Sequence, residues 1–255
     1  MGDLLVDTSE GITTITLNRP EKRNAINEEI WLGLERAFID SGRDTSVRAV
    51  VVTGAGGSFC SGQDLSPEGR PGPPLQRMRR VADVAIALHR LPKPTIARVD
   101  GVAAGAGANL ALACDLVIAS QRSRFIQIFA TRGLSLDFGG SWLLPRRVGM
   151  ATAKELALLA EPVDADAAVS MGMINRAVPD DDLDSVVDDW ARRLATGPTL
   201  ALSHTKRLLD LSPTSSFEQA VEAEGAAQVS NQASTDTVEA MTAFLERRSP
   251  RFTGR

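Results

Sequence analysis

The sequence predicts an α/β fold built around a mostly parallel sheet. Runs of β-branched residues at 47–53 and 95–99 alternate with longer segments whose apolar residues recur at helical spacing. This alternation is typical of parallel strands joined by crossover helices. Beyond residue 140 the pattern becomes almost entirely helical, so we expect the C-terminal part of the chain to be a helical region.

Each predicted element rests on local periodicity and on the residues that interrupt it. We expect strands where β-branched residues alternate or run together, namely at 4–7, 11–18, 47–53, 95–99, 115–120 and 173–178. We expect helices where apolar residues repeat every three or four positions, namely at 28–40, 75–90, 108–113, 141–148, 151–160, 165–170, 183–196, 200–209 and 217–246. Asn27 is placed to cap the first helix, and Pro20 ends the strand before it.

The composition is that of an ordinary globular protein. Of the 255 residues, 43% are hydrophobic and 24% are charged, and the formal net charge is −4. The sequence has no long basic stripe, so we expect no nucleic-acid partner. The two cysteines, Cys60 and Cys114, lack metal-ligand spacing, which argues against a disulfide scaffold or a metal site. They fit a reducing compartment, and we expect a cytoplasmic protein.

We expect neither a targeting signal nor a membrane span. Residues 1–11 are acidic and lack the basic and apolar regions of a secretory signal. The longest apolar region, 102–119, is interrupted by Asn109 and Asp115. Such a pattern is typical of a buried core segment rather than of a helix that crosses a bilayer.

Two glycine-rich turns directly follow predicted strands, one at 54–62 and one at 101–107. Open α/β sheets bind ligands where parallel strands end, and a turn with almost no side chains lets a ligand approach bare backbone. The second turn leads into a helix, whose N-terminal amides suit an oxygen that gains negative charge during a reaction. Small residues also permit close packing of a strand on a helix, so this turn alone leaves both interpretations open.

Four motifs in combination resemble the crotonase superfamily, also called enoyl-CoA hydratase/isomerase. They are LNRPEKRNAIN at 17–27, CSGQDL at 60–65, the glycine turn at 101–107 and AFLERRSPRFTGR at 243–255. The resemblance implies a crotonase (ClpP-like) spiral core of repeated ββα units over 1–195. It also implies a C-terminal helical region over 196–255 that trimerises and covers the substrate site. The expected substrate is a coenzyme A thioester, with no separate cofactor, no membrane partner, and a homotrimer or dimer of trimers as the assembly.

The resemblance also implies roles for individual residues. The thioester oxygen is expected between the backbone amides of Gln63 and Ala106. Asp64 is expected to hold the first of these turns through its carboxylate. The positions that match coenzyme A contacts are Lys22, Arg23, Ala25, Ser61, Asp64, Leu65, Phe244 and Arg247. Lys22 and Arg23 also fit a solvated turn, and Phe244 also fits ordinary helix packing.

The residues that differ from the family pattern decide the expected chemistry. Typical hydratases of this family use two glutamates, and the matching positions here carry Asn109 and Phe129, which cannot transfer protons near neutral pH. Asn109 is expected to orient a neighbouring group instead. One carboxylate, Asp137, lies where enoyl-CoA isomerases and the PaaG-type ring-epoxide isomerases of phenylacetate catabolism carry an acid. Its apolar neighbours Leu136 and Phe138, with Phe129, would exclude water and raise its pKa.

We therefore expect an acyl-CoA isomerase in which Asp137 shuttles one proton and the two amides hold an enolate. It would convert a 3-enoyl-CoA to a 2-enoyl-CoA or isomerise a related ring epoxide, and residues 66–75 are expected to line the acyl pocket. The alternatives are an enoyl-CoA hydratase of β-oxidation, a dehalogenase-like enzyme with Asp137 as nucleophile, and a non-catalytic acyl-CoA binder. Without the family context, Asp137 fits a helix cap better than a catalytic acid.

Overall fold

A six-stranded sheet forms the centre of the fold. The computed structural model describes residues 2–66, 69 and 72–254. The strand order is β1-β2-β3-β4-β6-β9, with β1 antiparallel to β2 and all other neighbours parallel. The strands are β1 (Leu4–Ser9), β2 (Ile12–Leu17), β3 (Ala49–Gly54), β4 (Thr95–Val99), β6 (Leu116–Ser120) and β9 (Arg176–Val178). The mostly parallel sheet predicted from the sequence is therefore confirmed.

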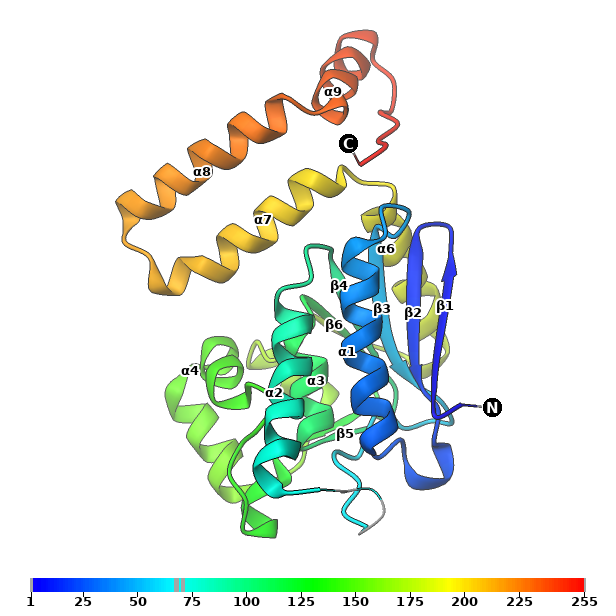
Figure 1. Cartoon of the computed structure of the whole chain (residues 1–255), viewed down its shortest axis with the longest axis vertical. Helices are drawn as coiled ribbons and strands as arrows, with labels where there is room; N and C mark the ends of the chain where they lie inside the picture. The colour runs from blue at the N-terminus through cyan, green and yellow to red at the C-terminus, as the bar shows by residue number, and fades with distance from the viewer. Residues whose placement is uncertain (1, 67–68, 70–71, 255) are drawn as a thin grey trace.

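Helices cover both faces of this sheet (Figure 1). Helices α1 (Glu28–Arg43) and α2 (Pro74–His89) lie on one face, and α6 (Leu183–Ala195) lies on the other. Alternate residues of β3 face opposite sides, because Val50 belongs to the larger core with α1 and α2 whereas Val51 packs with α6. Every residue of β3 is buried, as expected for a strand that is covered on both faces.

A second, three-stranded sheet was not predicted. It has the order β5-β7-β8, and its strands are β5 (Val102–Ala104), β7 (Arg124–Ile126) and β8 (Val163–Asp164). Strands of two or three residues are too short to show an alternating pattern, so sequence reasoning placed β5 inside an irregular turn. The helix expected from residue 108 also begins earlier, since α3 spans Ala106–Ala113.

The C-terminal half is mainly helical, as predicted. Its other helices are α4 (Gly140–Leu159), α5 (Ala165–Ser170), α7 (Thr199–Leu211), α8 (Phe217–Gln232) and α9 (Thr235–Glu246). Short 3-10 helices lie along the whole described chain, at Pro20–Lys22, Ile128–Arg132, Asp180–Asp182 and Ser212–Thr214. Gly149, with a φ of 76° and a ψ of 162°, interrupts α4 between the two helices predicted there. The single helix predicted at 217–246 was wrong, because Ser234 caps a new helix by accepting a hydrogen bond from the Thr237 amide.

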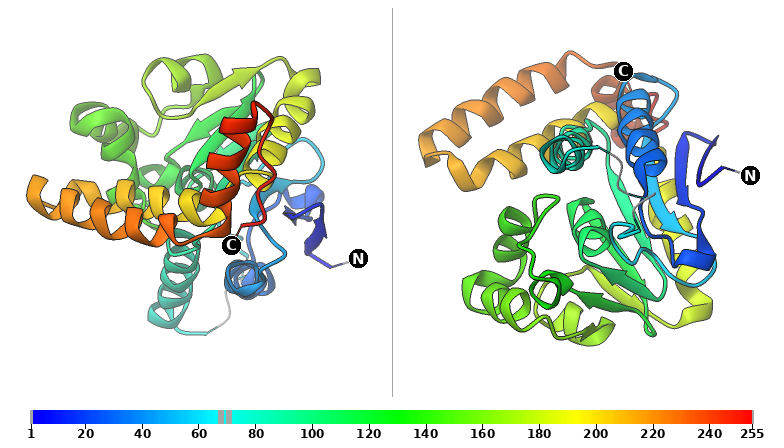
Figure 2. Two further views of the ribbon diagram at one scale, coloured as in Figure 1. Left: turned by 90° about the horizontal axis from the view of Figure 1, so that it is seen from above. Right: turned by 60° about the horizontal axis from the view of Figure 1, so that its bottom comes forward.

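Helices α7 and α8 form a hairpin that extends away from the sheet (Figures 1 and 2). Neither helix has a buried residue in the single chain. In the described part of the chain, none of the helices is both long enough and apolar enough to cross a bilayer.

Arg48, just before β3, joins the helical region to the sheet. Its guanidinium donates to the Thr199 hydroxyl at 2.8 Å, to the Phe252 carbonyl at 3.1 Å and to the Gly197 carbonyl. Inside the tail, the buried Asp236 carboxylate accepts hydrogen bonds from backbone amides, including that of Gly254 at 2.8 Å. The last residues are thereby held against both α9 and the sheet.

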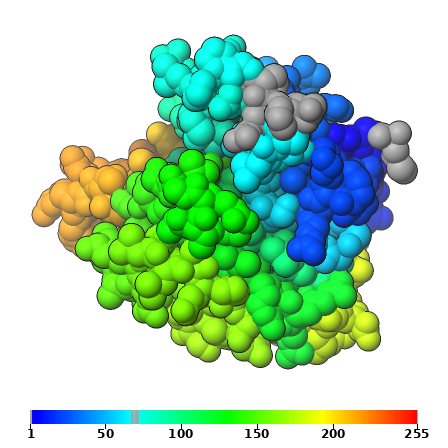
Figure 3. All heavy atoms as spheres, turned by 90° about the horizontal axis from the view of Figure 1, so that it is seen from below, coloured from blue at the N-terminus to red at the C-terminus, as the bar shows by residue number. Residues whose placement is uncertain are grey.

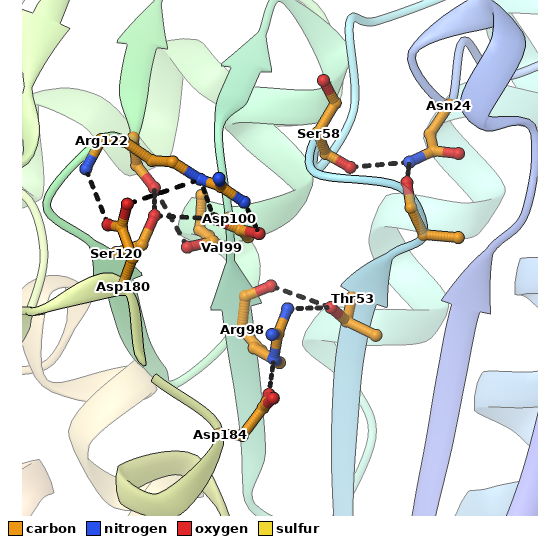
Figure 4. A network of polar contacts seen from close by, with 12 residues as sticks. Asn24, Thr53, Ser58, Arg98, Val99, Asp100, Ser120, Arg122, Asp180 and Asp184 are labelled. Atoms are coloured by element: carbon orange, nitrogen blue, oxygen red, sulfur yellow. Dashed lines mark hydrogen bonds and ion pairs between the residues drawn. The ribbon is translucent and has the colours of Figure 1, made fainter. Parts of the chain in front are cut away.

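A polar network fixes the edge of the sheet where the chain leaves β4 (Figure 4). Asp100 accepts a hydrogen bond from Ser120 at 2.8 Å and pairs with the Arg122 guanidinium, whose Nε lies 2.7 Å away. The hydrogen bond from Arg122 is the main cause that lowers the pKa of Asp100. The next residue, Gly101, has a φ of +70° and passes so close to the Gly57 carbonyl oxygen that a Cβ would collide with it. Chain direction at this corner therefore depends on a glycine.

We expect Gly101→Ala to destabilise the protein much more than Gly133→Ala. Gly133 has a similar φ of +65°, but a Cβ there would meet no described atom within 4 Å. Both variants incur the left-handed backbone cost of about 1–2 kcal/mol, and the collision at residue 101 adds about 1–3 kcal/mol. Urea unfolding followed by circular dichroism measures the difference. Equal destabilisation would contradict the close approach to Gly57.

Candidate active site

Two turns meet beside the N-terminus of α3. The segment after β3 pairs with β5, because the Cys60 amide donates to the Val102 carbonyl at 3.0 Å and the Ala104 amide donates to the Cys60 carbonyl at 2.9 Å. Gly62, with a φ of +98°, lies so near that a Cβ on it would be 3.7 Å from the Ala106 nitrogen. The pairing thus brings the CSGQDL turn next to the first residue of α3.

The backbone amides of Gln63 and Ala106 are free in this arrangement. The Ile26 amide donates to the Gly62 carbonyl and the Asp64 amide donates to the Ile26 carbonyl, each at 2.8 Å. Because successive residues of an extended segment face opposite sides, the Gln63 amide points away from Ile26. Ala106 is the first residue of α3, where helix amides have no partner within the helix. Within residues 2–66, 69 and 72–254, neither amide donates a hydrogen bond. Two adjacent free donors can stabilise an oxyanion.

Asp64 ties the first turn to the segment before α1. Its carboxylate accepts from the Ser66 amide and from the Arg19 guanidinium, each at 3.0 Å. Burial alone would raise the pKa of Asp64, but the hydrogen bonds from Ser66 and Arg19 lower it to about 2. Arg19 also donates to the Ala25 carbonyl at 2.7 Å. Asp64 therefore acts within the protein as a structural anion, with its charge already neutralised by Arg19.

The basic residues expected at a coenzyme A channel lie beside this turn. Ser61 donates its amide to the Arg23 carbonyl at 3.0 Å and its hydroxyl to the Lys22 carbonyl at 3.3 Å. The Lys22 and Arg23 side chains are exposed, and Leu65 is 47% exposed. These residues form a rim around the turn. In the space-filling view, the segments near residues 20–30, 60–66, 72–80 and 130–140 lie on one face (Figure 3).

Asp137 does not cap α4. The residue before α4 is Gly139, which makes no side-chain cap hydrogen bond, so the capping alternative was wrong. Oδ1 of Asp137 is buried and has no hydrogen-bond partner among the described residues. Burial raises the pKa of Asp137 to about 6, with no contribution from a charged group among the described residues. In this part of the chain, the carboxylate therefore has no cation that would lower its pKa.

The apolar residues expected to shield Asp137 are buried or half-buried. Phe138 is 3% exposed and stacks on Trp31 of α1 with a centroid distance of 5.7 Å. Phe129 is 6% exposed and lies beside the Gly105 backbone, while Leu136 is half-buried. That these three residues exclude water from the carboxylate stays a prediction.

Asn109 contacts protein groups on both sides of its amide. It is fully buried, and its Nδ2 donates to the backbone carbonyl of Asp137 at 2.9 Å. Its Oδ1 accepts from Nε2 of Gln127, also at 2.9 Å. It thus orients the Asp137 loop, as expected, but has no exposed surface with which to line a substrate pocket.

Sequence reasoning missed Gln127 and Trp31. In the described part of the chain, three buried side-chain atoms lack hydrogen-bond partners, namely Trp31 Nε1, Gln127 Oε1 and Asp137 Oδ1. The available signal for Gln127 was a polar amide inside the apolar run FIQIF, directly after a strand. Native proteins contain few such unpaired groups. Trp31 stacks on Phe138 and Gln127 is linked through Asn109 to the Asp137 carbonyl, so all three belong to one region, which favours a functional site.

The remaining expected residues lie elsewhere or outside the description. Phe244 is 80% exposed on α9, and Arg247 ends that helix, far from β5 and α3 in the single chain (Figure 1). The expectation that residues 66–75 line an acyl pocket falls partly outside the described residues. In the part of the chain that the structure covers, no cluster of three or more His, Cys, Asp or Glu side chains could hold a metal ion.

Comparison with known proteins identifies the family. A family model described as enoyl-CoA hydratase/isomerase matches residues 7–255. The chain is 40% identical to 1,2-epoxyphenylacetyl-CoA isomerase of Escherichia coli (strain K12), covering 99% of this chain and 98% of that protein. It is 42% identical to a Rhodobacter capsulatus protein named "Probable enoyl-CoA hydratase", covering 98% and 97%.

The fold comparison agrees. The crystal structure of an enoyl-CoA hydratase from Mycobacterium smegmatis matches with a TM-score of 0.92 at 34% identity, covering 99% of each chain. The protein therefore belongs to the enoyl-CoA hydratase/isomerase family, and the predicted crotonase fold with a helical C-terminal region is confirmed.

We expect ionisation of Asp137 to cost stability. Its pKa in the folded state, about 6, lies above the ordinary 3.8, so stability falls as pH rises from about 4 to about 6. Asp137→Asn should remove this loss and gain about 1–3 kcal/mol relative to wild type above pH 6, with little gain below pH 4. Thermal unfolding across this range measures it, with the exposed Asp83→Asn as control. A gain that does not change with pH would contradict the burial of the charge.

Proposed function

We propose that the protein is an acyl-CoA isomerase that moves one proton along the acyl chain of its substrate. The observation that carries this proposal is a desolvated carboxylate, Asp137, whose backbone is bonded to Asn109 of α3, the helix that begins at the free Ala106 amide. The positions of the two hydratase glutamates hold Asn109 and Phe129, so no second acid supports water addition.

The two amides would bind the thioester oxygen. Gln63 and Ala106 donate to this oxygen as the thioester becomes an enolate, and fixed donors of this kind lower a barrier by about 3–4 kcal/mol each. Asp137 removes a proton from the carbon next to the thioester carbonyl. It then returns the proton two carbons further along, which moves the double bond into conjugation with the carbonyl.

The pKa of Asp137 suits both halves of this reaction. A value of about 6 leaves the carboxylate ionised at neutral pH and therefore ready to accept a proton. The same value makes the carboxylate a stronger base than an ordinary solvated aspartate, and its protonated form keeps the proton long enough to return it to the acyl chain. The buried rings of Phe129 and Phe138 exclude water and so favour return of the proton over hydration.

The substrate is proposed to be a coenzyme A thioester. The exposed cations Lys22 and Arg23 lie next to the Gln63 turn, where they can meet phosphate charge. The similar Escherichia coli protein named 1,2-epoxyphenylacetyl-CoA isomerase supports a ring-epoxide acyl group as one candidate. A 3-enoyl chain requires the same proton shift and is the other candidate.

Wild-type protein should convert a 3-enoyl-CoA to its 2-enoyl isomer, and Asp137→Asn should lower kcat about 10²–10⁴-fold while acyl-CoA still binds. Mass spectrometry after reaction in deuterated water reports both the product and the exchanged carbon. Asp83→Asn, on the exposed side of α2, is the matched control.

Three other results would contradict this proposal. A 3-hydroxyacyl-CoA as the main product from a 2-enoyl-CoA would identify a hydratase. An acyl or aryl ester trapped on Asp137 would identify a nucleophile. Tight acyl-CoA binding without turnover of 3-enoyl or ring-epoxide substrates would identify a binding protein.

The proposal includes assembly through the C-terminal helices. Apolar side chains on α7, α8 and α9 are unusually exposed, with Phe217, Phe244 and Leu245 each at 80%. Large apolar side chains exposed in this number favour a protein–protein interface. The proposed assembly is a homotrimer or a dimer of trimers, in which Phe244 and Arg247 can approach the site of a neighbouring chain.

Light scattering should therefore give three or six times the mass of the chain. Phe244→Asp combined with Leu245→Asp should shift the protein towards monomer, because charged groups would be buried in the interface. Val6→Asp, which changes an exposed apolar residue of β1, is the control. A wild-type monomer at micromolar concentration would rule out the proposed assembly.

A further inference from the structure

Gln127 lies where it can influence both halves of the candidate site. It directly follows β7, and the carbonyl of the preceding Ile126 accepts a hydrogen bond from the Gly105 amide at 2.8 Å. Gly105 immediately precedes Ala106, whose amide is one of the two free donors. The backbone at the end of β7 therefore fixes the amide side of the site.

The side chain of Gln127 acts on the part of the site that carries Asp137. It is 4% exposed, and its Nε2 donates to Oδ1 of Asn109, whose Nδ2 donates in turn to the Asp137 carbonyl. Each of these bonds is 2.9 Å long. Gly140 permits this geometry, because a Cβ at that residue would collide with Nδ2 of Asn109.

The side chain of Gln127 pairs with the amide of Asn109 rather than filling the core. Its Oε1 is buried without a hydrogen-bond partner among the described residues, which costs about 1–3 kcal/mol. Leucine or methionine would remove this cost but would leave the buried Oδ1 of Asn109 without its donor. The contribution of Gln127 is therefore the hydrogen bond that holds Asn109.

The Asp137 carboxylate depends on its backbone for position. Its Oδ1 has no partner in the described chain, so no side-chain bond to that atom holds the carboxylate in place. Its carbonyl is held by Asn109 and by the Gly140 amide, each at 2.9 Å. Loss of the Asn109 bond would therefore release one of the two restraints on this carbonyl.

We propose that Gln127 is a positioning residue that, through Asn109, holds the Asp137 carboxylate at a fixed place relative to the Ala106 amide. This inference rests on the proposed role of Asp137 as the proton shuttle. Gln127 touches no reacting atom. It sets the alignment of the base, and an error of about 1 Å in such alignment costs about 100-fold in rate.

The test is Gln127→Met, which keeps the volume but cannot donate to Asn109. We expect kcat for 3-enoyl-CoA isomerisation to fall about 10–100-fold, with KM within three-fold of wild type. Gln121→Met changes an exposed glutamine in the connection before β7 and should leave both constants unchanged. Gln127→Leu, which also lacks a donor for Asn109, should behave like Gln127→Met and replaces it if that variant does not fold.

A second readout does not depend on turnover. In protein labelled with ¹³C at the aspartate carboxyl carbons, the Asp137 signal is the one lost in Asp137→Asn, and its titration gives the pKa directly. We expect the pKa, about 6 in wild type, to fall towards 4 in Gln127→Met, because a loosened loop admits water to the carboxylate.

These two readouts separate the possible failures. If wild type does not isomerise but the Asp137 pKa falls in Gln127→Met, the positioning role stands and the proposed reaction is wrong. If wild type isomerises and both kcat and the pKa are unchanged in Gln127→Met and Gln127→Leu, Gln127 is only a core residue and the inference is overturned.

Discussion

The pairing of Cys60 with β5 is the interaction on which the site depends. Two backbone hydrogen bonds, of 3.0 Å to Val102 and 2.9 Å from Ala104, join segments that are more than 40 residues apart in the sequence. These bonds place the turn that follows β3 against the beginning of α3. Gly107 makes this approach possible, since a Cβ there would lie 2.5 Å from the Cys60 carbonyl oxygen. Without this pairing, the two free amides would belong to separate surfaces.

The aspartates of the site differ in function because their surroundings differ. Asp64 and Asp100 are each paired with an arginine, and both have lowered pKa values. Oδ1 of Asp137 is buried and pairs with no cation among the described residues, and burial raises the pKa of Asp137 to about 6. A carboxylate paired with an arginine stabilises the fold, but its low pKa makes it too weak a base to take up a proton at neutral pH. The unpaired carboxylate of Asp137 lowers the stability of the fold, and its raised pKa makes it a stronger base.

The sequence predicts long, regular elements better than short or buried polar ones. Strand β4 was predicted at its observed bounds, 95–99, because a β-branched run between breakers is a local signal. Strands β5, β7 and β8 were missed because each depends on pairing with a distant segment. Asp137 was found by resemblance, since an aspartate before a helix locally indicates a cap. Gln127 gave little signal, because its partner Asn109 lies 18 residues away and the link exists only in the folded chain.

The contacts of Arg48 set an order for synthesis and folding. Its partners Gly197, Thr199 and Phe252 lie about 150–200 residues further along the chain. A growing chain therefore completes the sheet around β3 while this guanidinium still lacks all three partners. Docking of the segment around Phe252 onto Arg48 must therefore be among the last of these steps. Helices α7 and α8, which have no buried residue in the single chain, lie between these late contacts in the sequence. Their apolar side chains are therefore exposed at a stage when the sheet has already formed.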